Sequence, residues 1–258
     1  MARPIGLQLC SVKQQMDEDF RGTIRRVADM GYAGVELSDL PEGVSYEEAG
    51  ALFREHGLEL ISARLAKDLV LGPSKVKPVE WMKALGGDCF TFGNTGFIAR
   101  GTVKRLSQLA TTCGIINEAY YLAREAGMTC GVHNHRGEFE EFEGRPIYQI
   151  LNEHLEPGVF WEIDTYWVHM GGRDCVEVVR ELGDRVQLLH MKDGTGNQGD
   201  PLTAIGAGIM DFASIVEAAP AARWLIVEVE GEVPDKLGAV AASCEYLANQ
   251  GLGAARES

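Results

Sequence analysis

The stretch GVHNHRGEFEEFEG, residues 131–144, combines two histidines with several glutamates directly after an apolar run. His133 and His135 are separated by one residue, and Glu138 follows soon after them. Imidazole nitrogens and carboxylate oxygens bind divalent metal ions, and both groups can transfer protons in a catalytic centre. The stretch is therefore a candidate source of a metal ligand and of a proton-transfer group.

Ionisable residues also interrupt three later hydrophobic runs. Asp164 lies in WEIDTYW, His190 in LLHMKD, and Glu228 and Glu230 lie in IVEVEGE. A buried charge without a partner costs several kcal/mol, so a single shared divalent cation would account for all of them. Oxygen and nitrogen donors without a thiolate favour Mn, Mg, Co or Zn in an open site over a closed structural zinc site.

Each of these residues also has a purely structural explanation when it is taken alone. His190 could be a core histidine bonded to a carbonyl, and Asp164 could cap the turn that follows it. Glu230 and the later glutamates of the 131–144 stretch could be solvated carboxylates, and one of the two HNH rings could be structural. Ligand-type residues at four separate strand ends favour the metal site over these explanations.

The chain alternates short apolar segments with amphipathic helical patterns from end to end. The segments that we predict to be strands are 5–10, 33–38, 58–63, 88–93, 128–134, 158–164, 186–191 and 224–230. Strands that are apolar on both faces and separated by helices indicate a parallel sheet covered by helices. The longest helix is expected over about 102–126.

Eight such units in a chain of 258 residues predict a closed (β/α)8 TIM barrel, an α/β fold, rather than an open doubly wound sheet. No GxGxxG motif follows the first strand, as a dinucleotide-binding sheet would require. We expect one TIM-barrel domain over 1–258, with a frayed tail at about 251–258. In such a barrel the strand ends that carry the candidate ligands meet at one face, where the active site lies.

Composition excludes several classes of function. The formal net charge is -14, with 24 Lys and Arg against 38 Asp and Glu, so we expect no nucleic-acid partner and no anionic membrane surface. The six cysteines are scattered without a CxxC pair, as in a reducing compartment. No signal peptide and no apolar run long enough to span a bilayer is seen, which predicts a soluble, cytoplasmic protein.

Several motifs, in order along the chain, resemble the sugar phosphate isomerase/epimerase superfamily, the xylose isomerase-like TIM barrels. The matching stretches are IGLQLCSVKQQM, GYAGVEL, VHNHRGEFE, FWEIDTYWVHMGG, RVQLLHMKDG, IGAGIMDF and WLIVEVE. The fifth-strand motif is similar to the HNHxxEF pattern of one branch, and the later ones are similar to D-T-x-W, H-x-K-D and a final V-E. The resemblance covers essentially the whole chain.

The resemblance implies a metal site and catalytic residues. The family's Glu-Asp-His-Glu metal set would fall on Glu138, Asp164, His190 and Glu228, with Glu138 and Glu228 also forming the acid/base pair of its epimerases. His135 competes with Glu138 for the position of first ligand and is a further catalytic candidate. Lys192 could hold a substrate oxygen or neutralise an enolate. Alternatively, Lys192 forms a salt bridge to Asp193 or Asp164.

Other positions are expected to line the substrate pocket. These are His133, Trp167, Glu36, Gln8 and Asn94. Arg64 stands after the third strand, where the branch often has a histidine, and it could bind a carboxylate or phosphate of the substrate or form an ion pair at the barrel rim. Ala207 in IGAGIMDF replaces a glutamate that is common in relatives.

The resemblance implies a divalent-metal-dependent isomerase or epimerase that acts on a sugar or sugar derivative through an enediolate-type intermediate. A metal-dependent dehydratase or hydratase of a keto-sugar or inosose, which is a lyase, would use the same groups. A non-catalytic sugar-binding barrel is the remaining alternative. DNA cleavage, as in endonuclease IV relatives, would need more histidines and a cationic surface. A homodimer or homotetramer is expected by resemblance only.

Overall fold

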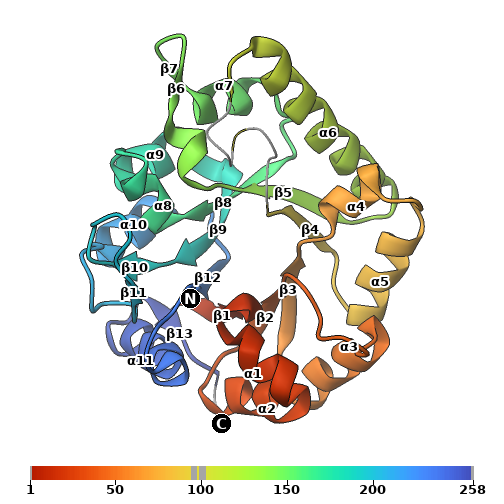
Figure 1. The fold of residues 1–258 in the computed structure, drawn as a ribbon, viewed down its shortest axis with the longest axis vertical. Helices are drawn as coiled ribbons and strands as arrows, with labels where there is room; N and C mark the ends of the chain where they lie inside the picture. Colours follow the sequence, from red (N-terminus) through yellow and green to blue (C-terminus); the bar gives the residue numbers. More distant parts are fainter. Residues whose placement is uncertain (1, 94–97, 99–102, 257–258) are drawn as a thin grey trace.

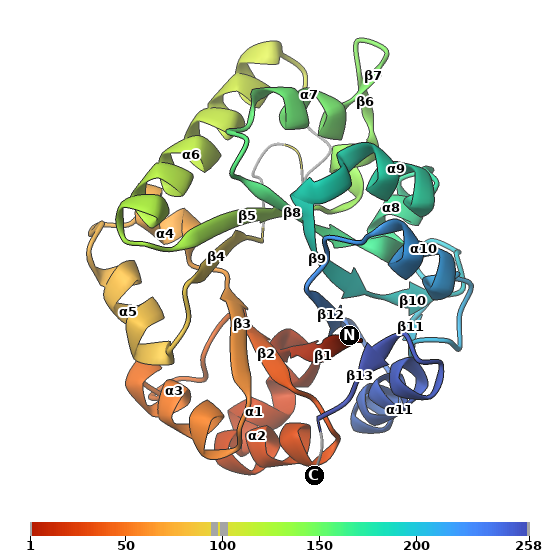
Figure 2. The same cartoon turned by 180° about the vertical axis from the view of Figure 1, so that it is seen from behind.

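The computed structural model describes residues 2–93, 98 and 103–256. In this part of the chain, eight parallel strands close into a barrel, because β12 pairs with β1 at the ends of the strand order. Figures 1 and 2 show the ring of strands surrounded by helices. The barrel strands are β1 (Arg3–Gln8), β2 (Gly34–Leu37), β3 (Glu59–Ala63), β4 (Cys89–Phe92), β5 (Thr129–His133), β8 (Phe160–Asp164), β9 (Val186–Met191) and β12 (Trp224–Val227).

Helices follow the barrel strands and form the outer layer (Figure 1). The α-helices are α1 (Lys13–Glu18), α2 (Phe20–Asp29), α3 (Tyr46–Glu55), α4 (Ala66–Leu71), α5 (Lys77–Leu85), α6 (Leu106–Glu125), α7 (Ile147–His154), α8 (Thr165–Met170), α9 (Cys175–Leu182), α10 (Phe212–Ala218) and α11 (Lys236–Asn249). Short 3-10 helices are η1 (Leu9–Val12), η2 (Arg136–Phe139) and η3 (Gly183–Arg185). Several helices begin where a side chain accepts a backbone N–H, as Ser45 does for α3 and Asp174 for α9.

Small strands complete the fold. The hairpin partners are β6 (Glu141–Phe142) with β7 (Arg145–Pro146) and β10 (Asp193–Gly194) with β11 (Leu202–Thr203). The strand β13 (Gly253–Ala254) pairs with β1. We expected residues 251–258 to be frayed, but Gly253 and Ala254 lie opposite Arg3 and Pro4 in parallel pairing, and the Arg256 N–H donates to Gly31. The backbone of β1 thus has a partner beyond the barrel ladder.

Apolar side chains fill the barrel near the amino ends of its strands. A small cluster inside the barrel comprises Ile61, Cys89, Phe160, Leu188, Trp224 and Ile226, and a much larger cluster packs elsewhere in the molecule. Gly131 in β5 leaves space for this filling, because a Cβ at that position would overlap the Phe160 ring. The buried polar side chains of the barrel strands lie further along, toward their carboxyl ends.

A single buried carboxylate holds the long loop after β9. Asp193 accepts five backbone N–H groups, those of Gly194, Gly206, Gly208, Ile209 and Met210, at 2.9–3.2 Å. The side chain is fully buried. The loop between β10 and α10 is therefore fixed through its main chain.

The predicted strands agree with the structure within a few residues at each end. The largest difference is at the eighth, because β12 ends at Val227 and Glu228 and Glu230 lie beyond it. The helix expected over 102–126 is α6, and part of its expected start falls outside the described residues. All six cysteines are free thiols. Among the described helices, none is long and apolar enough to cross a membrane.

Candidate active site

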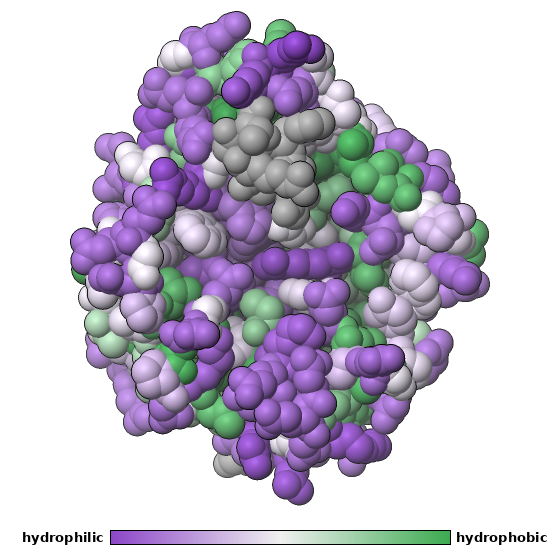
Figure 3. All heavy atoms as spheres, in the orientation of Figure 1, coloured by the Kyte–Doolittle hydropathy of each residue, from purple (hydrophilic) through white to green (hydrophobic). Residues whose placement is uncertain are grey.

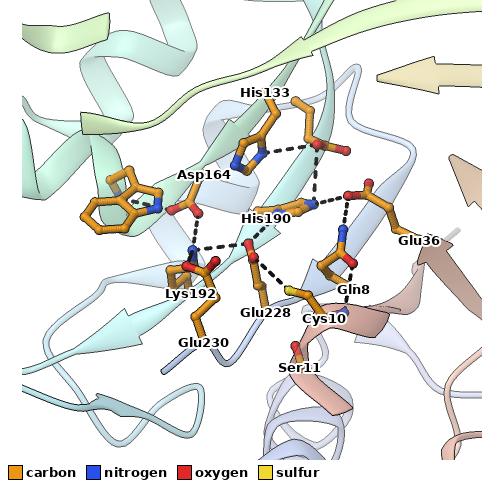
Figure 4. Close-up of polar contacts among 12 residues, drawn as sticks. Gln8, Cys10, Ser11, Glu36, His133, Asp164, His190, Lys192, Glu228 and Glu230 are labelled. Carbon is orange, nitrogen blue, oxygen red and sulfur yellow. Dashed lines mark hydrogen bonds and ion pairs between the residues drawn. The ribbon is translucent and has the colours of Figure 1, made fainter. Parts of the chain in front are cut away.

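Four ligand-type side chains meet at the carboxyl ends of the barrel strands. His133 ends β5, Asp164 ends β8, His190 lies in β9, and Glu228 follows β12. One ligand atom from each residue lies within 4.8 Å of the others, and all four side chains are buried. Figure 4 shows them pointing toward one another. We call His133, Asp164, His190 and Glu228 the four-ligand group; it could hold a metal ion.

The four-ligand group contains three of the four ligands expected from the sequence, and it contains a histidine where Glu138 was expected. Asp164, His190 and Glu228 come together, and His133, which we expected only to line the pocket, joins them. Glu138 belongs to none of the groups of three or more ligand atoms found among the described residues. It lies on η2 beyond the strand, where its carboxylate accepts the His135 N–H at 2.8 Å. A turn of 3-10 helix thus separates Glu138 from the strand end that carries His133.

A second set of buried acids lies on the other side of His190. His190 Nε2 is 3.2 Å from Glu36 Oε1 and 3.5 Å from Glu162 Oε2, and Glu162 Oε2 is 3.1 Å from His133 Nδ1. Glu162 was not among the residues expected from the sequence. Its position two residues before Asp164 could have revealed it, because alternate residues of a strand face the same side.

Glu36, expected to line the pocket, lies deep in the barrel. It accepts hydrogen bonds from Gln8 Nε2 and from Ser62 Oγ, and it lies 3.4 Å from Arg64 Nε. Burial by itself would raise the pKa of this carboxyl group, but the neighbouring His190 and then Arg64 outweigh burial and hold the pKa well below its usual range. Glu36 is therefore a carboxylate at neutral pH.

The other titratable groups near His190 respond to the same charges. Burial and the neighbouring Glu36 raise the pKa of Glu162, which favours its protonated form. Burial opposes the charged form of His190, but Glu162, Glu36 and Glu228 together raise its pKa well above the usual value. The protonated forms of Glu162 and His190 are therefore favoured next to the candidate ligand atoms.

Lys192 contacts three carboxylates at the mouth of the barrel. Its Nζ lies 2.8 Å from Asp164 Oδ2, 3.2 Å from Glu228 Oε2 and 2.8 Å from Glu230 Oε2. The same ammonium lies 5.1 Å from the centre of the Trp167 ring. The expected salt bridge to Asp164 is present, whereas the side chain of Asp193 is engaged by backbone N–H groups. These carboxylates outweigh the effect of burial and keep the pKa of Lys192 above its usual value.

The segment after β12 is held by residues from the start of the chain. The Val229 N–H donates to Ser11 Oγ at 2.9 Å, and Cys10 Sγ donates to Glu228 Oε1 at 3.2 Å. The first contact fixes the backbone next to Glu228, and the second holds the Glu228 side chain (Figure 4). Cys10 and Ser11 were not among the residues expected at the site, since neither stands in a cluster of ligand-type residues in the sequence.

The remaining expected residues are distributed around this centre. Arg64 forms its ion pair with Glu36 inside the barrel, and its side chain is only 16% exposed. His135 and Trp167 line a cavity of about 740 Å³ beside the four-ligand group. Asn94 lies outside the described residues.

Comparison with known proteins gives the family. A family model described as the xylose isomerase-like TIM barrel matches residues 24–250. The chain belongs to the xylose isomerase-like TIM barrel family. The match concerns the family as a whole and does not distinguish the HNHxxEF branch. A search of curated proteins found no match.

Solved structures share the barrel. A sugar phosphate isomerase/epimerase from Parabacteroides distasonis is 26% identical, with a TM-score of 0.75 over 95% of this chain and 98% of that one. An L-ribulose 3-epimerase is 18% identical, with a TM-score of 0.71 over 98% and 95% of the two chains. A probable 3-DHS dehydratase from Bacillus anthracis is 13% identical, with a TM-score of 0.71 over 96% and 99%. The two structures with the lower identities show the shared fold alone.

Proposed function

We propose that this member of the xylose isomerase-like family is a divalent-metal-dependent enzyme that isomerises or epimerises a sugar or sugar derivative. The observation that carries the proposal is the four-ligand group, in which two imidazoles and two carboxylates from four strand ends converge in a buried site. Its nitrogen and oxygen donors suit Mn, Mg, Co or Zn.

The buried polar atoms around His190 fit a bound cation. Among the described residues, His133 Nδ1, His190 Nε2 and both carboxylate oxygens of Glu162 are buried and form no regular hydrogen bond; His133 Nδ1 and His190 Nε2 lie 3.1–3.5 Å from the carboxylates of Glu36 and Glu162. Buried polar atoms are normally satisfied, so such a cluster needs protons or a cation to compensate it. His133, Asp164, His190 and Glu228 would hold the ion, and Glu36 would orient the His190 ring from its other nitrogen.

A divalent ion in this site would orient two neighbouring oxygens of the sugar and stabilise the negative charge of an enediolate. The ammonium of Lys192 lies against Asp164 and Glu228, where it can stabilise negative charge on a substrate oxygen. Glu228, which contacts both His190 and Lys192, is a candidate proton acceptor. Burial lowers the pKa of His135 to about 4, so its imidazole is neutral at pH 7 and can accept a hydrogen bond from a substrate hydroxyl.

Metal analysis of purified variants tests the ligand assignment. We expect His133→Ala, Asp164→Ala and His190→Ala each to weaken Mn binding by about tenfold or more, while Glu138→Gln retains it. Glu140→Ala, which removes an exposed carboxylate of the same segment, is the matched control. Full Mn occupancy in Asp164→Ala and His190→Ala would show that these residues are not ligands. Loss of the metal in Glu138→Gln alone would return the first-ligand role to Glu138.

Proton exchange tests the reaction. Keto-sugars incubated with the protein and Mn in heavy water should exchange the proton next to the carbonyl, and the Asp164→Ala variant should not catalyse this exchange. Product analysis separates the outcomes, because a dehydratase or hydratase would change the oxygen content of the sugar. A sugar that binds without any exchange would identify a non-catalytic binding protein and contradict the proposal.

A further inference from the structure

The cavity beside the four-ligand group is large compared with one sugar ring. Its volume is about 740 Å³, within the range of roughly 300–1,000 Å³ that is typical of pockets for drug-sized ligands. A monosaccharide has about a dozen non-hydrogen atoms, and at roughly 30 Å³ for each, the volume of a water molecule in the liquid, it fills about half of this space at most. The reacting ring would also lie partly over the four-ligand group. Space therefore remains for a second moiety.

One wall of the cavity is aromatic and apolar. Tyr166, Trp167 and Met170 project from α8, directly after the strand that carries Asp164. Trp167 also contacts the Lys192 ammonium, which places its ring at the junction between the cavity and the four-ligand group. Aromatic side chains of this kind pack against the apolar faces of sugar rings and of aromatic rings.

Two residues that line the cavity each carry a buried polar atom without a partner. Within the described part of the chain, His135 Nδ1 and Trp167 Nε1 are buried and form no hydrogen bond. A buried donor or acceptor that stays unsatisfied costs about 1–3 kcal/mol, so a partner from a bound ligand is expected. Hydroxyl or ether oxygens of a ligand can satisfy both atoms, since an indole N–H donates and a neutral imidazole can do either.

The charges on the lining disfavour an anionic ligand. Asp200, Glu230 and Glu232 line the cavity, and Arg136 is the one cation among its described lining residues. Glu230 is already paired with Lys192 at 2.8 Å. A phosphate group in this cavity would face an excess of negative charge. Hydrophilic side chains cover much of the face of the molecule seen in Figure 3.

We propose that this cavity binds a second, uncharged ring that is covalently attached to the reacting sugar at a position that leaves its reacting carbonyl free, so that the substrate is a glycoside-sized molecule and not a free monosaccharide or a sugar phosphate. The second ring packs on Trp167 and Met170, and its oxygens, or those of the glycosidic link, bind Trp167 Nε1 and His135 Nδ1. An aromatic aglycone and a second sugar unit both provide such a ring. This inference rests on the proposed function, which places the reacting sugar at the four-ligand group.

Calorimetric titration of the full chain, with and without Mn, tests the inference. The one-ring ligands are glucose, galactose and mannose. For each of these sugars, the phenyl glycoside, a disaccharide that contains it and its 6-phosphate are also titrated. We expect at least one two-ring ligand to bind about tenfold or more tightly than its own monosaccharide, and the 6-phosphates to show no such gain. A gain for the phenyl glycoside identifies an aromatic aglycone, and a gain for the disaccharide alone identifies a second sugar.

Variants test whether the tighter binding of two-ring ligands depends on the residues of the cavity. Trp167→Ala and, independently, Met170→Ala should each remove most of the tenfold preference, whereas Trp167→Phe should keep most of it for the phenyl glycoside. Trp81→Ala is the matched control, because Trp81 stacks on Tyr46 between α3 and α5, away from the cavity lining. Circular dichroism establishes that each variant is folded.

Three results would overturn the inference: equal binding of one-ring and two-ring ligands, no binding of any two-ring ligand, or tightest binding of a 6-phosphate. The proposed function fails separately, since it depends on metal binding by Asp164 and His190. A two-ring preference in a protein that binds no metal would contradict only the proposed function. Metal binding with a preference for monosaccharides would contradict only the second ring.

Discussion

His190 presents its two ring nitrogens to different carboxylates. Nδ1 lies 2.7 Å from Glu228 Oε2, and Nε2 lies 3.2 Å from Glu36 Oε1. Gln8 and Ser62 hold Glu36 in turn, so the orientation of the ring depends on residues of three other strands. A histidine ligand is normally positioned through its second nitrogen in this way. The buried acids behind His190 therefore support the four-ligand group without belonging to it.

Removal of the Lys192 charge should destabilise the metal-free protein. In Lys192→Met the carboxylates of Asp164 and Glu228 lose a buried cation, and we expect the free energy of unfolding to fall by about 3 kcal/mol or more. Added Mn should recover part of this loss, because it restores positive charge between the same carboxylates. Urea unfolding with EDTA or Mn measures both effects. Lys67→Met, at an exposed lysine, is the control, and equal stability of the two variants would contradict the prediction.

The pH dependence of stability should contain a contribution from His135. Burial, followed by the charge of Arg64, lowers its folded-state pKa to about 4, below the unfolded value of about 6.5. The unfolded chain therefore takes up a proton first as pH falls, so stability is present above about pH 6.5 and is lost between there and pH 4. Between pH 7.5 and 5.0 this amounts to about 2 kcal/mol.

Urea unfolding in EDTA at these two pH values measures the contribution. We expect the unfolding free energy of His135→Gln to fall by less than that of the wild type when the pH is lowered. His169→Gln, which replaces an exposed histidine, should follow the wild type. An identical pH dependence of wild type and His135→Gln would show that His135 is not held in its neutral form.

At the scale of the elements, the site is built from strand ends and from the first residues after them. Asp164 ends β8 and also caps α8 by accepting the Trp167 N–H at 2.9 Å. The same residue is therefore both the helix cap that the structural explanation required and a member of the four-ligand group. Because the Trp167 N–H bonds to Asp164, the position of Trp167 in the cavity depends on the position of this proposed metal ligand.

The loop after β10 should loosen when its anchor is removed. In Asp193→Ala five backbone N–H groups lose their acceptor, and we expect faster proteolysis and hydrogen exchange over residues 194–210. The global free energy of unfolding should fall by about 2–4 kcal/mol, because some of these groups are left buried. Asp200→Ala, which removes an exposed carboxylate of the same loop bonded to Thr195 and Asn197, should have a smaller effect. Equal exchange rates in the two variants would contradict the assignment of Asp193 as the anchor.

At the scale of the whole molecule, the sequence was sufficient to predict the barrel. Eight apolar runs separated by amphipathic helices admit few topologies, and the closed parallel barrel is the one that covers every strand. The meeting of Asp164, His190 and Glu228 followed from that topology alone, since strand ends of a parallel barrel lie on one face. The pairing of residues 253–254 with β1 was not predictable, because two small residues carry no strand pattern.

The identity of the fourth member of the four-ligand group depended on local backbone geometry. The expected Glu138 lies five residues beyond His133, after the strand has given way to the 3-10 helix η2. The alternation of a strand no longer applies there, so the motif could not show which way the carboxylate points. Glu162 was overlooked for the opposite reason, since it lies within an apolar run although it shares the inner face of β8 with Asp164.

The attachment of the loop at Asp193 has a consequence for how this barrel could acquire new specificities. In the described part of the chain, the Asp193 carboxylate accepts hydrogen bonds only from backbone N–H groups. Side chains at positions 197–202, which line the cavity, can therefore be substituted while these hydrogen bonds are kept. Randomised libraries at these positions, with the aspartate kept, would sample different cavity walls on an unchanged scaffold. Selection experiments aimed at altered glycoside preference have their natural starting point here.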